Sequence, residues 1–488
     1  MTPGPLRGAN GVAFGPDGRL HVAEFLAGRI SAVDLATGDV EVVVPPGVVR
    51  SPDDLAFGAD GSMYVADLVP GIVRRWTPGG AVTVAEGVRN PNGIATLGDR
   101  LFVNEMIPGG RLLELTADGP IVLTDGLAMG NAMQAGPDGA LYYPHMLTGE
   151  VHRIAPSGGA PELVAADVHE PVAVRFGLDG VMHVLSRGAA GLVTRIDLFG
   201  TGDRTVVASG ITGLDNAAVD AENRMFVSSY ATGVIAELSP DGRTREVVRP
   251  GSPGPFGITV DLGGTVRAAS HYRVGETLAT FAHGIVSDGA ETHVTSQYGQ
   301  VRTIQDQDQA TRVRSSALSQ PLGLTVRDGD LLVAEAGAGR VVSLAPDDAL
   351  TVLADGLGRP VDVAVDESGI CYVSDEERGA VYRLGAGKPA VVADGLSAPQ
   401  GIAFRGTSLL VVEAGRGRVL AVSPDTGEVR VEASGLALDV PTDDFDLVAH
   451  GLPGLPRPFA GVAVGPDGTA HVALNGVGSV LALPPPRG

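Results

Sequence analysis

The sequence is poor in cysteine, in aromatic residues and in long apolar runs. Its 488 residues include one cysteine, Cys371, which excludes an internal disulfide and a cysteine-based metal site. No apolar run approaches the roughly 18 residues that cross a membrane. The N-terminal stretch MTPGPLRGANG lacks the basic and apolar regions of a signal peptide. We therefore expect a soluble, cytoplasmic protein with no membrane partner.

Basic residues are also scarce. The chain has 35 Lys and Arg residues against 57 Asp and Glu residues, a formal net charge of −22. Such an acidic chain argues against a nucleic-acid partner. The acidity has two interpretations, which are solubility and an acidic cavity that attracts a cation. The sequence does not indicate an oligomeric state.

Glycine and proline are abundant, with 70 and 34 residues, while 44% of the residues are hydrophobic and only 4% aromatic. This composition is typical of many short strands joined by tight turns. The stretches NGVAFGPDGRLHVAEF, DDLAFGADGSMYVADL and NGIATLGDRLFVNEM show a repeat of about 40 residues. Twelve units follow one another, and their aligned positions are Gly11, Asp54, Gly93, Ala132, Ala173, Asn216, Gly257, Gly284, Gly323, Asp362, Gly401 and Gly461.

Apolar residues alternate with other residues inside each unit, and Gly-containing turns separate four such runs. Four antiparallel strands per repeat predict a β-propeller blade. Because propellers usually have about four to eight blades, we predict an all-β protein of two tandem six-bladed propellers. Residues 1–251 form the first, and residues 252–488 form a degenerate second propeller that serves as a structural part or a lid. An insertion at 433–457 shows no motif.

The residue that opens the first strand of each blade is expected at one rim of the central channel. In the first propeller these residues are Asn10, Asp53, Asn92, Asn131, Val172 and Asp215, and in the second they are Phe256, His283, Leu322, Val361, Gln400 and Ala460. Strand capping by Asx turns would need Asn and Asp equally in both propellers. Because only the first has them, we predict a ring of oxygen ligands for a hard cation. Ca²⁺ is the expected ion, ahead of Mg²⁺, Mn²⁺ and Zn²⁺.

The residues that close the second strands are expected on the same rim. Among them, His145 is a candidate general base, because the ordinary pKa of histidine lies near neutrality. A surface histidine in a loop is the alternative. Glu24 is a second candidate for an acid or base. His152 and His183 lie inside predicted strands and are interpreted as structural.

The stretches ANGVAFGPDGRLHVAEFLAGRI, RNPNGIATLGDRLFVNE and GLDNAAVD resemble the calcium-dependent propeller hydrolases of the regucalcin, gluconolactonase and paraoxonase group. The resemblance implies a central divalent ion that orients a lactone or ester carbonyl, with a rim histidine as base. It places the ligands at Asp215, Asn216, Asn92, Asn131 and, more loosely, Asn10, and the base at His145. The first-blade glutamate of that group has no clean counterpart here, so Asp53 is its best substitute and Glu24 the second choice.

We therefore predict a divalent-metal-dependent hydrolase of a small-molecule lactone or ester. Asp53, Asn92, Asn131 and Asp215 would hold the ion, with Asn10 and Asn216 nearby. Two alternatives remain open. One is a metal-assisted lyase or biosynthetic cyclase at the same site, as in the virginiamycin-type lyases and strictosidine synthase-like propellers of this scaffold. The other is a non-enzymatic binding propeller with a structural metal.

Overall fold

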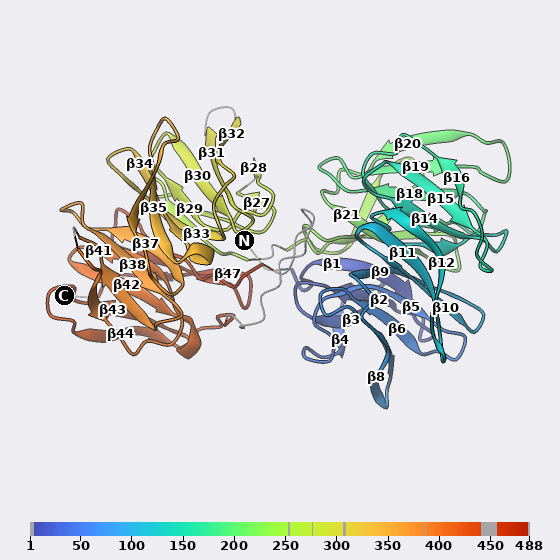
Figure 1. Cartoon of the computed structure of the whole chain (residues 1–488), viewed down its shortest axis with the longest axis horizontal. Coiled ribbons are helices and arrows are strands. Elements are labelled where there is room, and N and C mark those ends of the chain that lie inside the picture. The colour runs from blue at the N-terminus through green and yellow to red at the C-terminus, as the bar shows by residue number, and fades with distance from the viewer. Residues whose placement is uncertain are drawn as a thin grey trace. The chain divides into compact units, whose positions relative to one another are not determined.

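The computed structural model describes residues 4–251, 254–275, 277–305, 309–385, 387–440 and 456–486, and the structural statements below refer to these residues. Most of the insertion inferred from the sequence, residues 441–455, lies outside them. The chain divides into two compact units, and the division falls after Gly251. Figure 1 shows that each unit consists of strands grouped into sheets.

The first unit contains six four-stranded antiparallel sheets. Their strands are β1 (Ala9–Phe14), β2 (Leu20–Glu24), β3 (Arg29–Val33) and β4 (Val40–Val44); β5 (Pro52–Phe57), β6 (Met63–Asp67), β7 (Ile72–Thr77) and β8 (Gly80–Glu86); β9 (Pro91–Leu97), β10 (Arg100–Glu105), β11 (Pro108–Thr116) and β12 (Gly119–Ala128); β13 (Gln134–Ala135), β14 (Leu141–His145), β15 (Glu150–Ile154) and β16 (Glu162–Ala165); β17 (Pro171–Phe176), β18 (Met182–Ser186), β19 (Leu192–Ile196) and β20 (Arg204–Ala208); β21 (Leu214–Val219), β22 (Met225–Ser229), β23 (Ile235–Leu238) and β24 (Thr244–Val248). The first strands of neighbouring sheets contact one another, and β1 contacts β21. The six sheets therefore close into a ring with their first strands at the centre.

Tight turns set the register inside each blade. In the GPDG turn between β1 and β2, the Gly15 N–H donates to the Arg19 carbonyl oxygen at 3.0 Å, and Gly18 has a φ of 74°. Glycine adopts this left-handed conformation without the steric cost that other residues carry. The aspartate of the turn accepts a hydrogen bond from the Arg19 N–H at 3.2 Å. The short turn explains why consecutive strands pair in sequence order.

The hydrophobic core of the first propeller lies between neighbouring blades. One cluster joins the first and last blades and includes Val22, Phe226 and Ile235, all buried. Another joins the third and fourth blades through Phe102 and Tyr143. The outermost strands bury little, because Val82 of β8 is 57% exposed. The apolar residues therefore hold the blades to one another around the ring.

The second unit repeats this architecture with irregular ends. Its sheets are β25 (Ile258–Val260) with β26 (Val266–Ala268); β27 (Arg273–Val274) with β28 (Thr277–Leu278); β29 (Ile285–Ser287), β30 (Glu291–Ser296), β31 (Gln300–Gln305) and β32 (Thr311–Ser315); β33 (Pro321–Arg327), β34 (Asp330–Glu335), β35 (Arg340–Leu344) and β36 (Leu350–Ala354); β37 (Pro360–Val365), β38 (Cys371–Asp375), β39 (Ala380–Arg383) and β40 (Ala390–Ala393); β41 (Pro399–Arg405), β42 (Ser408–Glu413), β43 (Arg418–Val422) and β44 (Val429–Ser434); and β45 (Val462–Val464), β46 (Ala470–Leu474) and β47 (Ser479–Leu483). Contact between β25 and β45 closes this ring. The protein is therefore an all-β tandem of propellers, as the repeat predicts.

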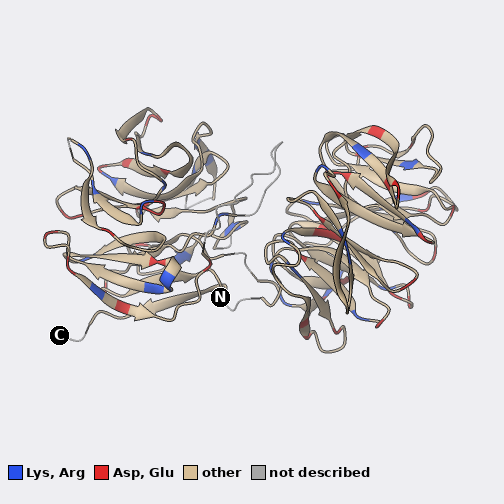
Figure 2. Cartoon of the chain, turned by 60° about the horizontal axis from the view of Figure 1, so that its bottom comes forward, with Lys and Arg blue, Asp and Glu red and all other residues tan. Residues whose placement is uncertain are grey.

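Helical structure is nearly absent from the described part of the chain. It consists there of two short 3-10 turns, η1 (Ala336–Ala338) and η2 (Ala414–Arg416). No helix in this part is long and apolar enough to cross a membrane. Acidic and basic residues are interspersed over the strands and turns of each unit in Figure 2, and many of them form ion pairs along the blades.

Candidate functional site

A break in strand register turns several opening residues of the first propeller toward its centre. The pairing of β5 with β6 shifts between Pro52 and Asp54, so Asp53 has no cross-strand partner. The pairing of β21 with β22 shifts in the same way between Leu214 and Ala217, around Asp215. Such bulges bend a strand and redirect a side chain. The local irregularity therefore brings side chains from different blades together.

Four predicted ligands, Asn10, Asp53, Asn92 and Asp215, meet at this centre. The Asn10 Nδ2 donates to Asp53 Oδ1 at 2.8 Å. Burial, followed by the charges of Asp215 and Asp54, raises the pKa of Asp53 well above its usual range, although hydrogen bonds from Asn10 and Asn92 oppose this shift. Burial and the charge of Asp54 raise the pKa of Asp215, which is half-buried, to about 7. The carboxylates are therefore held at a position where negative charge is unfavourable.

Two amide oxygens at the same centre have no hydrogen-bond partner among the residues that the structure describes. They are Asn10 Oδ1 and Asn92 Oδ1, both buried. A buried polar atom without a partner loses the free energy of its hydration and gains nothing in return. A cation bound here would be coordinated by these oxygens and would offset the charge of the carboxylates. Oxygen ligands of this kind suit Ca²⁺ and Mg²⁺, so the residues present fit a hard divalent cation.

The other two predicted ligands are already engaged with the backbone. The Ala132 N–H donates to Asn131 Oδ1 at 2.7 Å, and the Ala217 N–H donates to Asn216 Oδ1 at 2.8 Å. The Asn131 Nδ2 faces the thioether of Met106 at 3.5 Å. Both asparagines lie at the centre, but their oxygens are directed along their own strands. In this structure each of these oxygens therefore already accepts one backbone hydrogen bond, unlike those of Asn10 and Asn92.

A buried ion pair that the sequence analysis did not identify lies beside these residues. The Arg175 guanidinium, from β17, is 3.6 Å from Asp54 Oδ2 of β5. Asp54 also accepts hydrogen bonds from Asn216 Nδ2 at 3.0 Å and from the Leu55 and Ile94 N–H groups. The signal for this pair is a charged residue, Arg175, at the strand position that Ala13 fills in the first blade.

The charge balance of this centre favours a cation. Asp53, Asp54 and Asp215 supply three carboxyl groups, and the charge of Arg175, which pairs with Asp54, also acts on Asp215. Arg187 also acts on Asp215, but its side chain is half-exposed and donates to Glu170 Oε2 at 3.1 Å. Among the described residues, Arg175 is therefore the one buried basic side chain at this centre, and three carboxyl groups share its charge.

Glu24, predicted as a possible acid or base, is held by structural contacts. Its carboxylate is fully buried and accepts hydrogen bonds from Arg29 Nε at 2.7 Å and from the Arg7 N–H at 2.9 Å. The closing acids of other blades make the same kind of contact, and they are Asp67, Glu105, Glu335, Asp375 and Glu413. This arrangement links the second strand of a blade to the segment that enters its first strand. Because both propellers repeat it, its role is structural.

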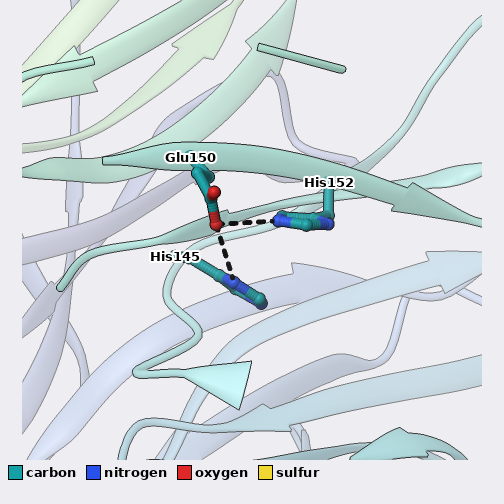
Figure 3. A group of neighbouring side chains, drawn as sticks. All are labelled: His145, Glu150 and His152. Carbon is teal, nitrogen blue, oxygen red and sulfur yellow. Dashed lines mark hydrogen bonds and ion pairs between the residues drawn. The ribbon is translucent and has the colours of Figure 1, made fainter. Parts of the chain in front are cut away.

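His145, predicted as the general base, lies at the end of β14 on the face of its blade. Its imidazole contacts the rings of His152 and Tyr143, with centroids 4.3 and 5.6 Å away. Its Nδ1 is 3.8 Å from Glu150 Oε2, and a dashed line marks this ion pair in Figure 3. Burial, followed by the charge of His152, lowers the pKa of His145 to about 4. The charged groups that shift the pKa of His145 are His152 and Glu150, which belong to this hairpin and not to the channel centre.

The centre of the second propeller is filled by aromatic rings. His283 stacks on Phe256, with centroids 4.8 Å apart, and on Phe459 at 5.4 Å. Arg457 is buried there, and its guanidinium pairs with Glu376. Aromatic rings therefore stand at the centre of this propeller where the first has Asn and Asp, and the charge of the buried Arg457 is compensated by Glu376.

The chain matches no protein-family model and no curated protein. It is similar to the solved structure of virginiamycin B lyase from Staphylococcus aureus, at 17% identity over 59% of this chain and 92% of that chain, with a TM-score of 0.38. A streptogramin B lyase structure is 14% identical over 76% of this chain and 91% of that chain, with a TM-score of 0.33. A candidate gluconolactonase is 14% identical over 51% of this chain and 91% of that chain, with a TM-score of 0.41. The assignment of a tandem propeller rests on the sheet order described above.

Proposed function

We propose that the first propeller binds a divalent cation, Ca²⁺ in the first instance, and uses it to hydrolyse a lactone or an ester. The observation that supports this proposal is the pair of buried, unpartnered oxygens, Asn10 Oδ1 and Asn92 Oδ1, beside the carboxylates of Asp53 and Asp215. These four side chains would hold the ion. When bound, it would supply a Lewis acid that polarises a substrate carbonyl oxygen.

The chain contributes a rigid, pre-formed set of oxygens. Asp53 is fixed by Asn10, and the Asp54 and Arg175 pair beside it joins strands of different blades. Asp215 is the more exposed of the two carboxyl groups. A site whose ligands are already in place loses little free energy in ordering them. The role of His145 as a general base stays a prediction.

Cation binding is tested by thermal unfolding of the whole protein in chelator and in excess Ca²⁺. At a concentration 100 times its dissociation constant, a ligand stabilises by about 2.7 kcal/mol, which corresponds to a shift of roughly 5–10 °C for a domain of this size. Asp53→Asn should abolish the shift. In chelator this variant should unfold at or above the wild-type temperature, because it lacks a buried charge. Asp362→Asn in the second propeller is the matched control and should keep the shift; a full shift in Asp53→Asn would disprove the site.

The reaction is tested by assaying lactones and esters in water enriched in oxygen-18. Hydrolysis transfers one solvent oxygen to the acid product, whereas elimination transfers none, so mass spectrometry of the product distinguishes the two. Turnover should disappear in chelator and in Asp53→Asn together. Unlabelled product would identify a lyase, and Ca²⁺ binding without turnover of any candidate would identify a binding propeller.

A further inference from the structure

Three metal-binding side chains lie on one face of the hairpin formed by β14 and β15. His145 pairs directly with Glu150 across the two strands, and Tyr143 pairs with His152. Residues two apart on a strand face the same side, so Glu150 and His152 share a face. The side chain of His145 lies on that face too, because its ring contacts His152. Figure 3 shows the two imidazoles and the carboxylate directed toward one another.

The distances between the ligand atoms of these side chains are close to those between the ligand atoms of a bound metal ion. His152 Nε2 is 3.2 Å from Glu150 Oε2, and His145 Nδ1 is 3.8 Å from the same oxygen. One ligand atom from each residue lies within 4.8 Å of the others. In a tetrahedral zinc site with bonds of 2.0–2.2 Å, ligand atoms are roughly 3.3 Å apart. Small rotations of these side chains would therefore place all three around one ion.

The imidazole of His145 has few polar contacts within the described residues. Its Nε2 is buried without a hydrogen-bond partner there, and its Nδ1 faces Glu150, whose Oε2 also accepts a hydrogen bond from the Thr148 hydroxyl at 2.8 Å. The side chains of His145, His152 and Glu150 are 13%, 18% and 33% exposed. The rings are thus mostly enclosed by the blade, while the carboxylate leaves an entry route from solvent.

We propose that His145, Glu150 and His152 form a transition-metal site, selective for ions such as Zn²⁺ and separate from the oxygen-only centre of the channel. Imidazole nitrogen suits zinc and its neighbours in the transition series, whereas oxygen alone suits Ca²⁺ and Mg²⁺. Three protein ligands leave a fourth position for water or another exchangeable ligand. This site stands whether or not the channel binds a cation.

A second cluster in the described residues, Asp288, Glu291 and His293, lacks these properties. Asp288 Oδ1 accepts hydrogen bonds from the Ala290 and Glu291 N–H groups at 2.8 and 2.7 Å. His293 Nδ1 lies 2.8 Å from the hydroxyl of Thr303. The turn and the neighbouring strand therefore occupy one atom of Asp288 and one of His293, while Asp288 Oδ2 still faces His293 Nε2 at 3.3 Å. Because this cluster has one imidazole in place of two, it is a comparison for the hairpin site rather than a second proposal.

The test is titration of the whole protein with Co²⁺ and Zn²⁺. Co²⁺ bound by three protein ligands in a near-tetrahedral site gives visible absorption bands, and Zn²⁺ should displace it with one ion per chain, measured by calorimetry. His152→Asn and Glu150→Gln should each weaken Zn²⁺ binding at least tenfold. The matched control is His183→Asn, at a half-buried histidine of β18, and it should bind Zn²⁺ as the wild type does.

Two further measurements show whether a loss is specific. Asp53→Asn should retain the Co²⁺ spectrum, because the channel is not part of this site. Glu150→Gln is a mild change at a partly exposed residue, and its circular dichroism and unfolding temperature without metal should match the wild type. Absence of the spectrum in the wild type, or equal Zn²⁺ affinity in wild type, His152→Asn and Glu150→Gln, would overturn the proposal.

Discussion

Arg175 is the residue on which the centre of the first propeller most depends. Its guanidinium donates to the carbonyl oxygens of Met133 and Ala217 at 2.8 and 2.9 Å and pairs with Asp54. These partners come from three other blades. A buried guanidinium is costly to desolvate, so it is retained only where its hydrogen bonds are satisfied. Here those bonds fix the spacing of the strands that present Asp53 and Asp215.

Arg175→Met should destabilise the first propeller by about 3–5 kcal/mol, because it leaves Asp54 buried without its partner. In the double variant with Asp54→Asn the loss should be smaller than the sum of the two single losses, since no unpaired charge remains. Urea unfolding of the wild type, the two single variants and the double variant gives the coupling free energy between the two side chains. Additive losses would show that the two side chains act independently.

At the residue scale, candidate site residues could be predicted where a local sequence signal existed. Asp53, Asn92 and Asn10 were predicted because Asn or Asp fills this position in most blades of the first propeller and in none of the second. Asp54 and Arg175 belong to blades far apart in the sequence, and their pairing depends on the closure of the ring. The direction of each asparagine amide also depends on the backbone around it. Periodicity gives neither kind of information.

At the scale of the blade, a buried acid ties each second strand to the segment before its first strand. Glu105 accepts hydrogen bonds from the Arg89 N–H at 3.0 Å and from Arg111 Nε at 2.9 Å. These contacts, which outweigh the opposing effect of burial, lower the pKa of Glu105 to about 2. The alternating strands and glycine turns were predicted from the sequence, but this connection was not, because its partners lie 16 residues apart and follow no strand period.

Glu105→Gln should cost about 2 kcal/mol at pH 7, after allowance for solvent screening of its exposed arginine partners. The folded pKa is depressed, so this contribution is present above the unfolded pKa of about 4.5 and is lost as pH falls through about 2. The difference between variant and wild type should therefore shrink to less than half at pH 3, measured by urea unfolding. Glu86→Gln, at an exposed residue of β8, is the control. A difference that is constant with pH would contradict the linkage.

At the scale of the whole molecule, one repeat has produced two propellers with different centres. The first gathers carboxylates and amide oxygens, and the second stacks Phe256, His283 and Phe459. The second propeller also has a cavity of about 290 Å³ between its first strands, and its lining includes Phe459 and one charged residue, Asp362. The same blade architecture is therefore compatible with either a charged or an apolar centre, because blade packing holds the ring together.

Asp362 occupies in the second propeller the position of Asp54 in the first, and it has no arginine partner among the described residues. It accepts hydrogen bonds from the Val363 and Ile402 N–H groups at 2.9 Å each. Burial, which outweighs these bonds, raises its pKa from 3.8 to about 7. The folded state then holds a proton that the unfolded chain releases near pH 4. This contribution to stability is fully present below about pH 4 and is lost as pH rises through about 7.

The second propeller should therefore lose roughly 2–3 kcal/mol of this contribution between pH 5 and pH 8. Asp362→Asn cannot titrate, so its unfolding free energy should change less over that interval than that of the wild type. Because Asp53 and Asp215 shift in the same direction, the comparison between the two proteins isolates Asp362 from the first propeller. Calorimetry at pH 5 and pH 8 in chelator measures the unfolding free energy of the wild type and of Asp362→Asn. Equal pH dependence in the two proteins would mean that Asp362 stays ionised in the folded state and that its two backbone hydrogen bonds outweigh its burial.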